Sequence, residues 1–255
     1  FVSGVPEVSG TPGRSLRVVT WNLLAPCWKR MGGGTKESGC PQIWRARLEA
    51  QCEFLSALNS DVVLVQEFWF HDEFRALWTD RFKDYAFFGS QRTGGKPDGL
   101  VTMVRKAMAP VAGDYVAVSF NDWGDRVASL LDLGGTFVCN THWTFPHPNE
   151  HDPIMRLAQA RKLADFLDQR VGDKACVIGG DLNGDKSDPA TKLLLSRGYH
   201  PHTQDAFVSH LNHNGESVGC DFLLTRGPAT LNAARLEGDA QRLAESERLS
   251  DHLAV

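Results

Sequence analysis

Six segments of this chain each place polar side chains at one end of a short apolar run, either just after it or just before it, and this repetition constrains the fold more than any other feature. The polar groups, in chain order, are Asn22, Glu67, His142, Asp181 with Asn183, Asp221, and Asp251 with His252. Apolar runs of this length are typical of buried strands. Polar groups at several strand ends are what a site at the rim of a sheet requires. The pattern predicts strands whose ends meet around one site.

A single polar residue after a strand is more typical of a turn or a strand cap than of catalysis. Asp181 and Asn183 lie two positions apart, so in an extended backbone their side chains point to the same side and can reach one ion. Carboxylate and amide oxygens suit a hard cation such as Mg²⁺. Six such positions in one chain favour a catalytic site over six unrelated turns.

The rest of the pattern predicts an α/β domain. Apolar residues at helical spacing predict helices over residues 43–59 and 154–169, and shorter helices are expected over residues 71–81 and 189–197, the latter closed by Gly198. Short β-rich runs predict strands over residues 85–89, 100–105, 115–120, 126–131 and 136–141. Consecutive strands broken by isolated helices favour two packed sheets with helices outside, rather than a doubly wound parallel sheet.

Length and composition favour one domain. A chain of 255 residues with 42% hydrophobic residues can enclose a single core, and we expect that domain over residues 16–255. Residues 1–15 begin with a stretch rich in Gly, Pro, Ser and Val and are expected to form a flexible leader. The sequence contains no run of about eighteen apolar residues, so it predicts no membrane span.

Cysteine spacing and charge bear on compartment and partners. The six cysteines include no Cys-x-x-Cys pair, which favours reduced thiols and an intracellular location, the cytoplasm or an organelle after removal of the leader. His200 with His202 and His210 with His213 are close pairs without a cysteine pair, so spacing does not predict zinc. The net charge of -4 argues against a broad polyanion-binding surface but allows nucleic acid in a local groove.

The six motifs resemble those of the endonuclease/exonuclease/phosphatase superfamily, in that family's order. The matching segments are Thr20-Trp21-Asn22, Gln66-Glu67, Asn140-Thr141-His142, Gly180-Asp181-Leu182-Asn183, Cys220-Asp221-Phe222 and Ser250-Asp251-His252. The opening Trp-Asn-Leu-Leu-Ala-Pro resembles most the deadenylase and nocturnin branch, and plant and algal relatives that carry calcium-binding hands elsewhere. The resemblance implies an α/β four-layer sandwich of two packed mixed β-sheets flanked by helices, and a metal-dependent hydrolase acting on phosphoester bonds.

The prediction of a metal site rests on ligand chemistry and on this resemblance. Glu67, a carboxylate at a strand end, suits a ligand of Mg²⁺, with Mn²⁺ as a substitute. The family match adds Asn22, as a neutral ligand or as an orienting group for Glu67, and Asp251 as a ligand from the other sheet. Leu24 stands where the repair-nuclease branch carries an aspartate, which speaks against an abasic-site endonuclease.

Two assignments of proton transfer remain open. His252 is the candidate general base because an imidazole titrates near neutral pH, and by family match Asp221 orients it. The competing assignment makes Asp181 the base and His252 a stabiliser of the transition state. In either case Asp181 and Asn183 are expected to align the attacking water and bind a phosphoryl oxygen, and His142 to donate to another.

Substrate contacts extend this set. Arg126 suits a phosphate-binding fork, although a solvent-facing salt bridge fits the sequence equally well. The Asp98-Gly99 pair matches a pair found in the family; without that match the two residues would predict only a turn. The residues expected to contact substrate are Asn183, His142, Arg126, Asp98 and Trp143. Aromatic side chains expected to stack on bases are Trp143, Phe145, Trp28 and Trp123.

Three functions compete. The leading one is a Mg²⁺-dependent phosphoesterase acting on RNA 3′ ends or nucleotides, so that single-stranded RNA or a nucleotide is the expected partner. The second is a sphingomyelinase-type or inositol-phosphate phosphoesterase, with a phospholipid or inositol phosphate as substrate. The third is a catalytically silent binding module, against which the intact site residues argue. We expect a monomer; the sequence predicts no particular protein partner.

Overall fold

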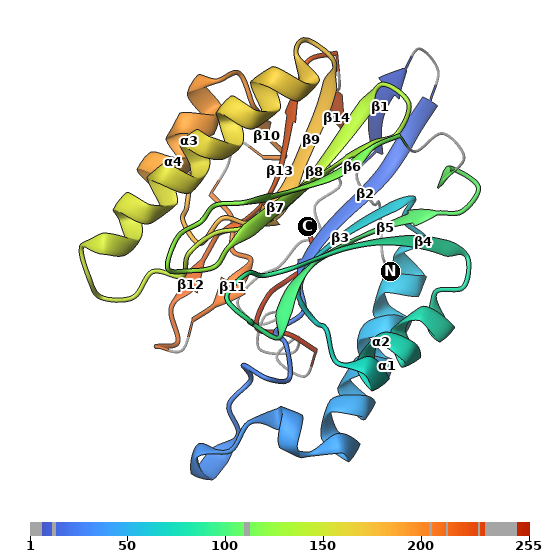
Figure 1. The fold of residues 1–255 in the computed structure, drawn as a ribbon, viewed down its shortest axis with the longest axis vertical. Coiled ribbons are helices and arrows are strands. Elements are labelled where there is room, and N and C mark those ends of the chain that lie inside the picture. The colour runs from blue at the N-terminus through green and yellow to red at the C-terminus, as the bar shows by residue number, and fades with distance from the viewer. Residues whose placement is uncertain are drawn as a thin grey trace.

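Two β-sheets lie face to face in this protein, and each is covered on its outer side by helices (Figure 1). The computed structural model describes residues 7–11, 14–109, 113–203, 206–212, 214–228, 230–232 and 249–255. The predicted four-layer sandwich of two mixed sheets flanked by helices is confirmed. Among the described helices, none is both long enough and apolar enough to span a membrane.

The first sheet has the strand order β14-β1-β2-β3-β5-β4. Its strands are β1 Glu7–Thr11, β2 Arg14–Asn22, β3 Val62–Trp69, β4 Tyr85–Gln91, β5 Asp98–Arg105 and β14 Thr230–Asn232. Only the central pair of β2 and β3 is parallel among these described strands. The first sheet is therefore mixed, with its parallel pair at the centre.

The second sheet has the order β10-β13-β9-β8-β7-β6 and repeats this plan, with β8 and β9 as its parallel pair. Its strands are β6 Tyr115–Ser119, β7 Val127–Asp132, β8 Thr136–His142, β9 Ala175–Asp181, β10 His200–Pro201 and β13 Asp221–Arg226. A separate pair is formed by β11 His210–Leu211 and β12 Ser217–Val218.

Alternation of side chains along the strands fills three apolar layers. In β2, Val19 and Trp21 pack toward the outer helices, whereas Leu16 and Val18 pack against the other sheet. The same alternation recurs in the second sheet. The outer helices are α1 Pro41–Leu58 and α2 Asp72–Arg81 on the first sheet, and α3 His151–Val171 and α4 Pro189–Ser196 on the second.

Two segments differ from expectation. Strand β1 lies inside the predicted leader, whose residues 1–6, 12 and 13 fall outside the described part of the chain. Residues 253–255 form no named strand, although Val255 exchanges two backbone hydrogen bonds with Thr20. The glycine-rich stretch that follows β2 contains two short 3₁₀ helices, Gly32–Gly34 and Glu37–Gly39. All six cysteines are free.

Candidate active site

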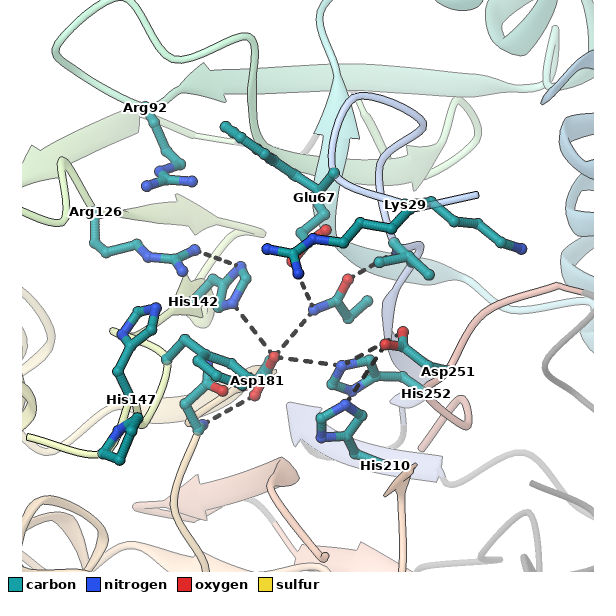
Figure 2. Close-up of a pocket in the computed structure, with 17 residues that line it drawn as sticks. Lys29, Glu67, Arg92, Arg126, His142, His147, Asp181, His210, Asp251 and His252 are labelled. Carbon is teal, nitrogen blue, oxygen red and sulfur yellow. Dashed lines mark hydrogen bonds and ion pairs between the residues drawn. The ribbon is translucent and has the colours of Figure 1, made fainter. Parts of the chain in front are cut away.

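A cavity of about 800 Å³ opens where the carboxyl ends of β2, β3, β8 and β9 meet (Figure 2). Parallel pairing explains the position, because it sets Asn22 beside Gln66 in one sheet and His142 beside Asp181 in the other. The predicted site residues that line the cavity are Asn22, Glu67, Arg126, His142, Asp181, Asn183, Asp251 and His252. The strand ends thus bring together groups from both halves of the chain.

Glu67 reaches the cavity through an irregularity in β3. The register against β5 shifts between Val65 and Phe68, and Glu67 has a φ of 53°. Such a bulge re-aims a side chain. The Oε2 atom accepts the backbone N–H of Ala25 at 3.0 Å. Burial first, and then the charges of nearby Asp98 and Asp251, raise the pKa of Glu67 to about 7.

The oxygen donors at this end of the cavity suit a hard divalent cation. Glu67 and Asp251 are mutually repulsive carboxylates, and the buried Oδ1 atom of Asp251 receives no hydrogen bond from the described residues. Asn22 donates from Nδ2 to Asp181 at 3.0 Å and to Glu67 at 3.5 Å, while its Oδ1 accepts the N–H of Leu24. In this arrangement Asn22 orients the carboxylates, and Glu67 and Asp251 are the groups that fit Mg²⁺ or Mn²⁺.

Asp181 lies at the centre of the polar network. Its Oδ2 atom is 3.3 Å from Nε2 of His142 and 3.8 Å from Nε2 of His252. Its Oδ1 atom accepts the N–H of Asn183 at 2.9 Å, and Asn183 holds a φ of 50°. Burial opposes ionisation, but His252 and His142 lower the pKa of Asp181 overall. Asp181 is therefore a charged group held between two imidazoles.

His252 is oriented from behind by a carboxylate. Its Nδ1 lies 2.8 Å from Oδ2 of Asp221, and this same oxygen accepts the hydroxyl of Ser209 at 2.7 Å. The Ser209 oxygen in turn accepts the backbone N–H groups of Cys220 and Asp221. Burial works against protonation of His252, but Asp221 and then Asp181 raise its pKa well above the usual value. The ring therefore has a fixed orientation, with Nε2 directed toward Asp181.

Two arginines form the cationic wall of the cavity. Arg126 is buried, and its Nη1 donates to Nδ1 of His142 at 2.9 Å. Burial and the charge of Arg126 lower the pKa of His142 to about 4, so the imidazole is neutral at physiological pH and carries its proton on Nε2. Arg92 is paired with Asp98 at 3.1 Å and lies near Arg126. Two neighbouring guanidinium groups that line one cavity suit an anionic ligand.

A family model described as the Endonuclease/Exonuclease/phosphatase family matches residues 19–252. The chain belongs to the endonuclease/exonuclease/phosphatase family. Its expected membership is confirmed, and that membership supports an enzyme that hydrolyses phosphoester bonds.

Relatives within and around this family are plant proteins and solved enzyme structures. The chain is 30% identical over 251 residues to an uncharacterised calcium-binding protein of Arabidopsis thaliana, covering 84% of this chain and 51% of that protein. It is 30% identical over 167 residues to the carbon catabolite repressor protein 4 homolog 3 of the same plant, covering 60% of this chain and 36% of that protein. The chain thus spans about half, or less, of the curated relatives that it matches.

The solved structures establish the fold at lower identity. The crystal structure of ANGEL2, a 2′,3′-cyclic phosphatase, has a TM-score of 0.67 at 14% identity, with 100% of this chain and 95% of that chain covered. The human Nocturnin catalytic domain with a bound sulfate anion has a TM-score of 0.63 at 16% identity, with 93% and 91% covered.

Two residues expected to contact substrate in this family member do not line the cavity. Trp143 is fully buried in the apolar layer beneath α3, because it continues the helix-facing side of β8, on which Phe137 and Cys139 lie. Asp98 is also fully buried, where it holds Arg92. The expected substrate contacts of Trp143 and Asp98 do not fit these buried positions, which are structural. Of the other aromatic residues, Trp28 and Phe145 line the cavity, whereas Trp123 is 88% exposed and lies outside it.

Sequence reasoning missed three groups at the site. Arg92 follows β4 in a polar stretch that carries no distinctive pattern. Ser209 and His210 lie in a hydrophilic stretch without a catalytic motif, yet Ser209 donates to Asp221 and His210 stacks on His252 with ring centroids 4.0 Å apart. Strand β11 pairs with the distant C-terminal segment, and no local signal in the sequence predicts that pairing.

Proposed function

We propose that this chain is a Mg²⁺-dependent phosphoesterase that hydrolyses nucleotides or RNA 3′ ends, in the manner of the deadenylase and nocturnin branch. The observation that carries the proposal is one cavity lined by Glu67, Asp181, Asp251 and His252 (Figure 2), in which Asp221 holds the His252 ring from behind. Acidic ligands for a hard cation and an oriented imidazole are the two elements that metal-assisted phosphoester hydrolysis requires.

The metal ion, with Mn²⁺ as a substitute, would be held by Glu67 and Asp251. When bound, it would supply charge relief for the phosphoryl oxygens. Asn22 keeps both Glu67 and Asp181 in place through its amide N–H groups. The ionised Asp181 is positioned to orient a water molecule, because its Oδ2 faces the cavity among polar groups. This division of roles leaves the proton to His252.

Because its pKa is raised well above the usual value, His252 carries that proton on Nε2 and would present it to the substrate, while Asp221 fixes the ring through Nδ1. Neutral His142 is held by Arg126 on one nitrogen and presents Nε2–H toward Asp181, where a phosphoryl oxygen would compete for it. Arg126 and Arg92 add positive charge on the same wall. These contacts would favour the transition state, in which negative charge accumulates on the phosphoryl group.

A nucleotide is favoured as substrate by the outer part of the cavity. Trp28 and Phe145 line it together with the basic residues Lys29 and Arg30. Aromatic faces next to positive charge are the usual way to bind single-stranded nucleic acid, because every base has a π-face and every linkage a charge. No described feature of the cavity favours a lipid in the same way.

The test is a substrate panel measured with the purified chain in the presence and absence of Mg²⁺. The panel contains 3′-labelled oligoadenylate, a nucleotide 2′-phosphate and sphingomyelin micelles, and His252→Ala serves as the inactive control. We expect Mg²⁺-dependent turnover of one of the first two substrates, lost in the control. Release of phosphocholine from sphingomyelin alone would instead establish the lipid branch.

A further inference from the structure

Trp123 is the most exposed large apolar side chain among the described residues, at 88%. It lies in the turn of residues 121–126 between β6 and β7, next to Gly124, whose carbonyl accepts Nη2 of Arg92 at 2.6 Å. Arg92 lines the cavity, so this turn forms part of the cavity rim. We propose that Trp123 stacks on a base of a single strand that continues out of the cavity, so that the site takes an oligonucleotide rather than a mononucleotide. This inference rests on the proposed function.

The turn that carries the indole of Trp123 is held in one conformation. Asn121 and Asp125 have φ values of 55° and 53°, a left-handed region that a non-glycine residue adopts only where its surroundings enforce it. The N–H of Phe120 donates to the carbonyl of Arg126 at 3.0 Å and closes the turn. Little backbone entropy therefore remains to be lost when a base stacks on the indole.

The turn also adjoins the loop that carries Phe145, one of the aromatic residues that line the cavity. Gln159 of α3 connects the two segments, because its Nε2 donates to Oδ2 of Asp122 at 2.5 Å and to Oγ1 of Thr144 at 2.7 Å. A Cβ atom on Gly124 would lie only 2.9 Å from that threonine oxygen, so the turn and the loop are in contact. Adjoining segments thus carry one aromatic side chain inside the cavity and one at its rim, which suits successive bases of a strand.

Charge at this rim favours an anionic strand as the occupant. Arg92 and Arg126 lie on one side of the cavity (Figure 2), and the buried Nε atom of each has no hydrogen-bond partner among the described residues. The two carboxylates that flank the indole are already engaged. Asp122 is bound from α3, and Oδ2 of Asp125 lies 3.8 Å from Nζ of Lys96. The positive charge of the two guanidinium groups is therefore available to phosphates that pass the rim.

Stacking outside the cavity makes affinity depend on the length of the substrate. A mononucleotide reaches only the aromatic residues that line the cavity, whereas a longer strand also reaches Trp123. Loss of one base–aromatic stack corresponds to roughly a tenfold loss of affinity. This loss should be the same at low and high salt, because stacking, unlike a phosphate contact, releases no counterions.

Fluorescence anisotropy of a labelled phosphorothioate oligoadenylate of about eight nucleotides, which resists hydrolysis, tests the site in the presence of Mg²⁺. Competition by AMP gives the affinity for a mononucleotide. We expect Trp123→Ala to weaken binding of the oligonucleotide about tenfold at both low and high salt, and to leave the affinity for AMP unchanged. Trp123→Phe should retain most of the affinity. Leu77→Ala, which removes an exposed side chain on α2, is the matched control and should bind as the wild type does.

Three results would overturn the inference. The first is wild-type affinity of Trp123→Ala for the oligonucleotide, and the second is a wild type that binds the oligonucleotide no better than AMP. The third is a dimer of the wild type, measured by sedimentation, that Trp123→Ala dissociates, because the indole would then face a second copy of the chain.

Hydrolysis separates failure of this inference from failure of the proposed function. On a cleavable oligoadenylate, Trp123→Ala should raise KM about tenfold and leave kcat unchanged, because the stacked base is remote from the reacting atoms. If the variant binds and hydrolyses the strand as the wild type does, the proposed function stands and the stacking site is wrong. If the wild type binds the strand through Trp123 but hydrolyses no phosphoester in Mg²⁺, the proposed function fails and the stacking site stands.

Discussion

At the scale of single residues, Glu67 combines two features that lower the stability of the fold: a strained backbone and a buried carboxylate near other carboxylates. Its φ of 53° lies in the left-handed region, which a non-glycine residue adopts only where the surroundings enforce it. Its carboxylate is placed near Asp98 and Asp251, and burial with these charges raises its pKa to about 7. A bound cation would offset the electrostatic cost, which makes Glu67 a residue that serves function at the expense of stability.

Glu67→Gln should therefore stabilise the metal-free protein at pH 8. The pKa of Glu67 rises from an ordinary 4.5 to about 7, so the native state holds more protons than the unfolded state and loses stability as pH rises through this window. Glutamine removes that loss, which is about 1–3 kcal/mol above pH 7. Urea unfolding at pH 8 and pH 4 measures it. An equal effect at both pH values would contradict the electrostatic explanation.

Asp221→Asn tests the orientation of His252. The amide keeps the size of the side chain but loses the charge that faces Nδ1 at 2.8 Å. We expect kcat to fall on the order of 100-fold or more, with Mg²⁺ affinity nearly unchanged. Asp80→Asn, an exposed carboxylate on α2, is the matched control and should retain full activity. A loss of Mg²⁺ binding in Asp221→Asn would assign Asp221 to the metal site.

At the scale of elements, the backbones of β8 and β9 approach each other closely where the two strands end at the site. A Cβ atom on Gly180 would lie 2.0 Å from the carbonyl oxygen of Thr141 in the parallel neighbour β8. Gly180→Ala must therefore push β9 away from β8 one residue before Asp181. We expect a loss of about 2 kcal/mol in stability and a clear fall in activity. Gly39→Ala, where a Cβ meets open space, should change neither quantity.

The loop before α1 is tied to the site by a buried ion pair. Arg47 binds the buried Glu37 and donates to the carbonyls of Leu23, Leu24 and Leu249, so it joins the loop that follows β2 to the C-terminal segment. Removing one member of such a pair leaves a buried charge without a partner.

Arg47→Met should accordingly destabilise the protein by about 3–5 kcal/mol. Arg45→Met, which removes a solvent-exposed pair with Glu73, should cost at most about 1 kcal/mol. Thermal unfolding of the two variants side by side gives the comparison. Similar effects for both would contradict a structural role for the buried pair.

Elements with a clear period were predictable, and those that depend on distant pairing were not. The two long helices, α1 and α3, follow from apolar spacing, and α1 begins at Pro41, a residue type that the first helical turn tolerates. The bulge that turns Glu67 into the cavity depends on β5, and β11 depends on the segment around His252. Trp143 shows the same limit, because nothing local distinguishes a core tryptophan from one that stacks on a base.

At the scale of the whole molecule, the site exists only when the fold is closed. Ser250 donates to the carbonyl of Asn22, and Trp21 donates to the carbonyl of His252, so the last residues lock onto the first central strand. Three apolar layers hold the two sheets and their helices in register. Family motifs predicted which groups meet, because their order along the chain carries that information; their contacts came only from the fold.

The most direct test of the central claim is hydrolysis of labelled oligoadenylate across a Mg²⁺ titration, in the wild type and in Glu67→Gln. The account predicts saturable, Mg²⁺-dependent turnover in the wild type, abolished by a chelator and restored by added Mg²⁺. In Glu67→Gln turnover should be lost while the fold is retained. Turnover that survives the chelator, or that is unchanged in Glu67→Gln, would contradict a metal-dependent site at this cavity.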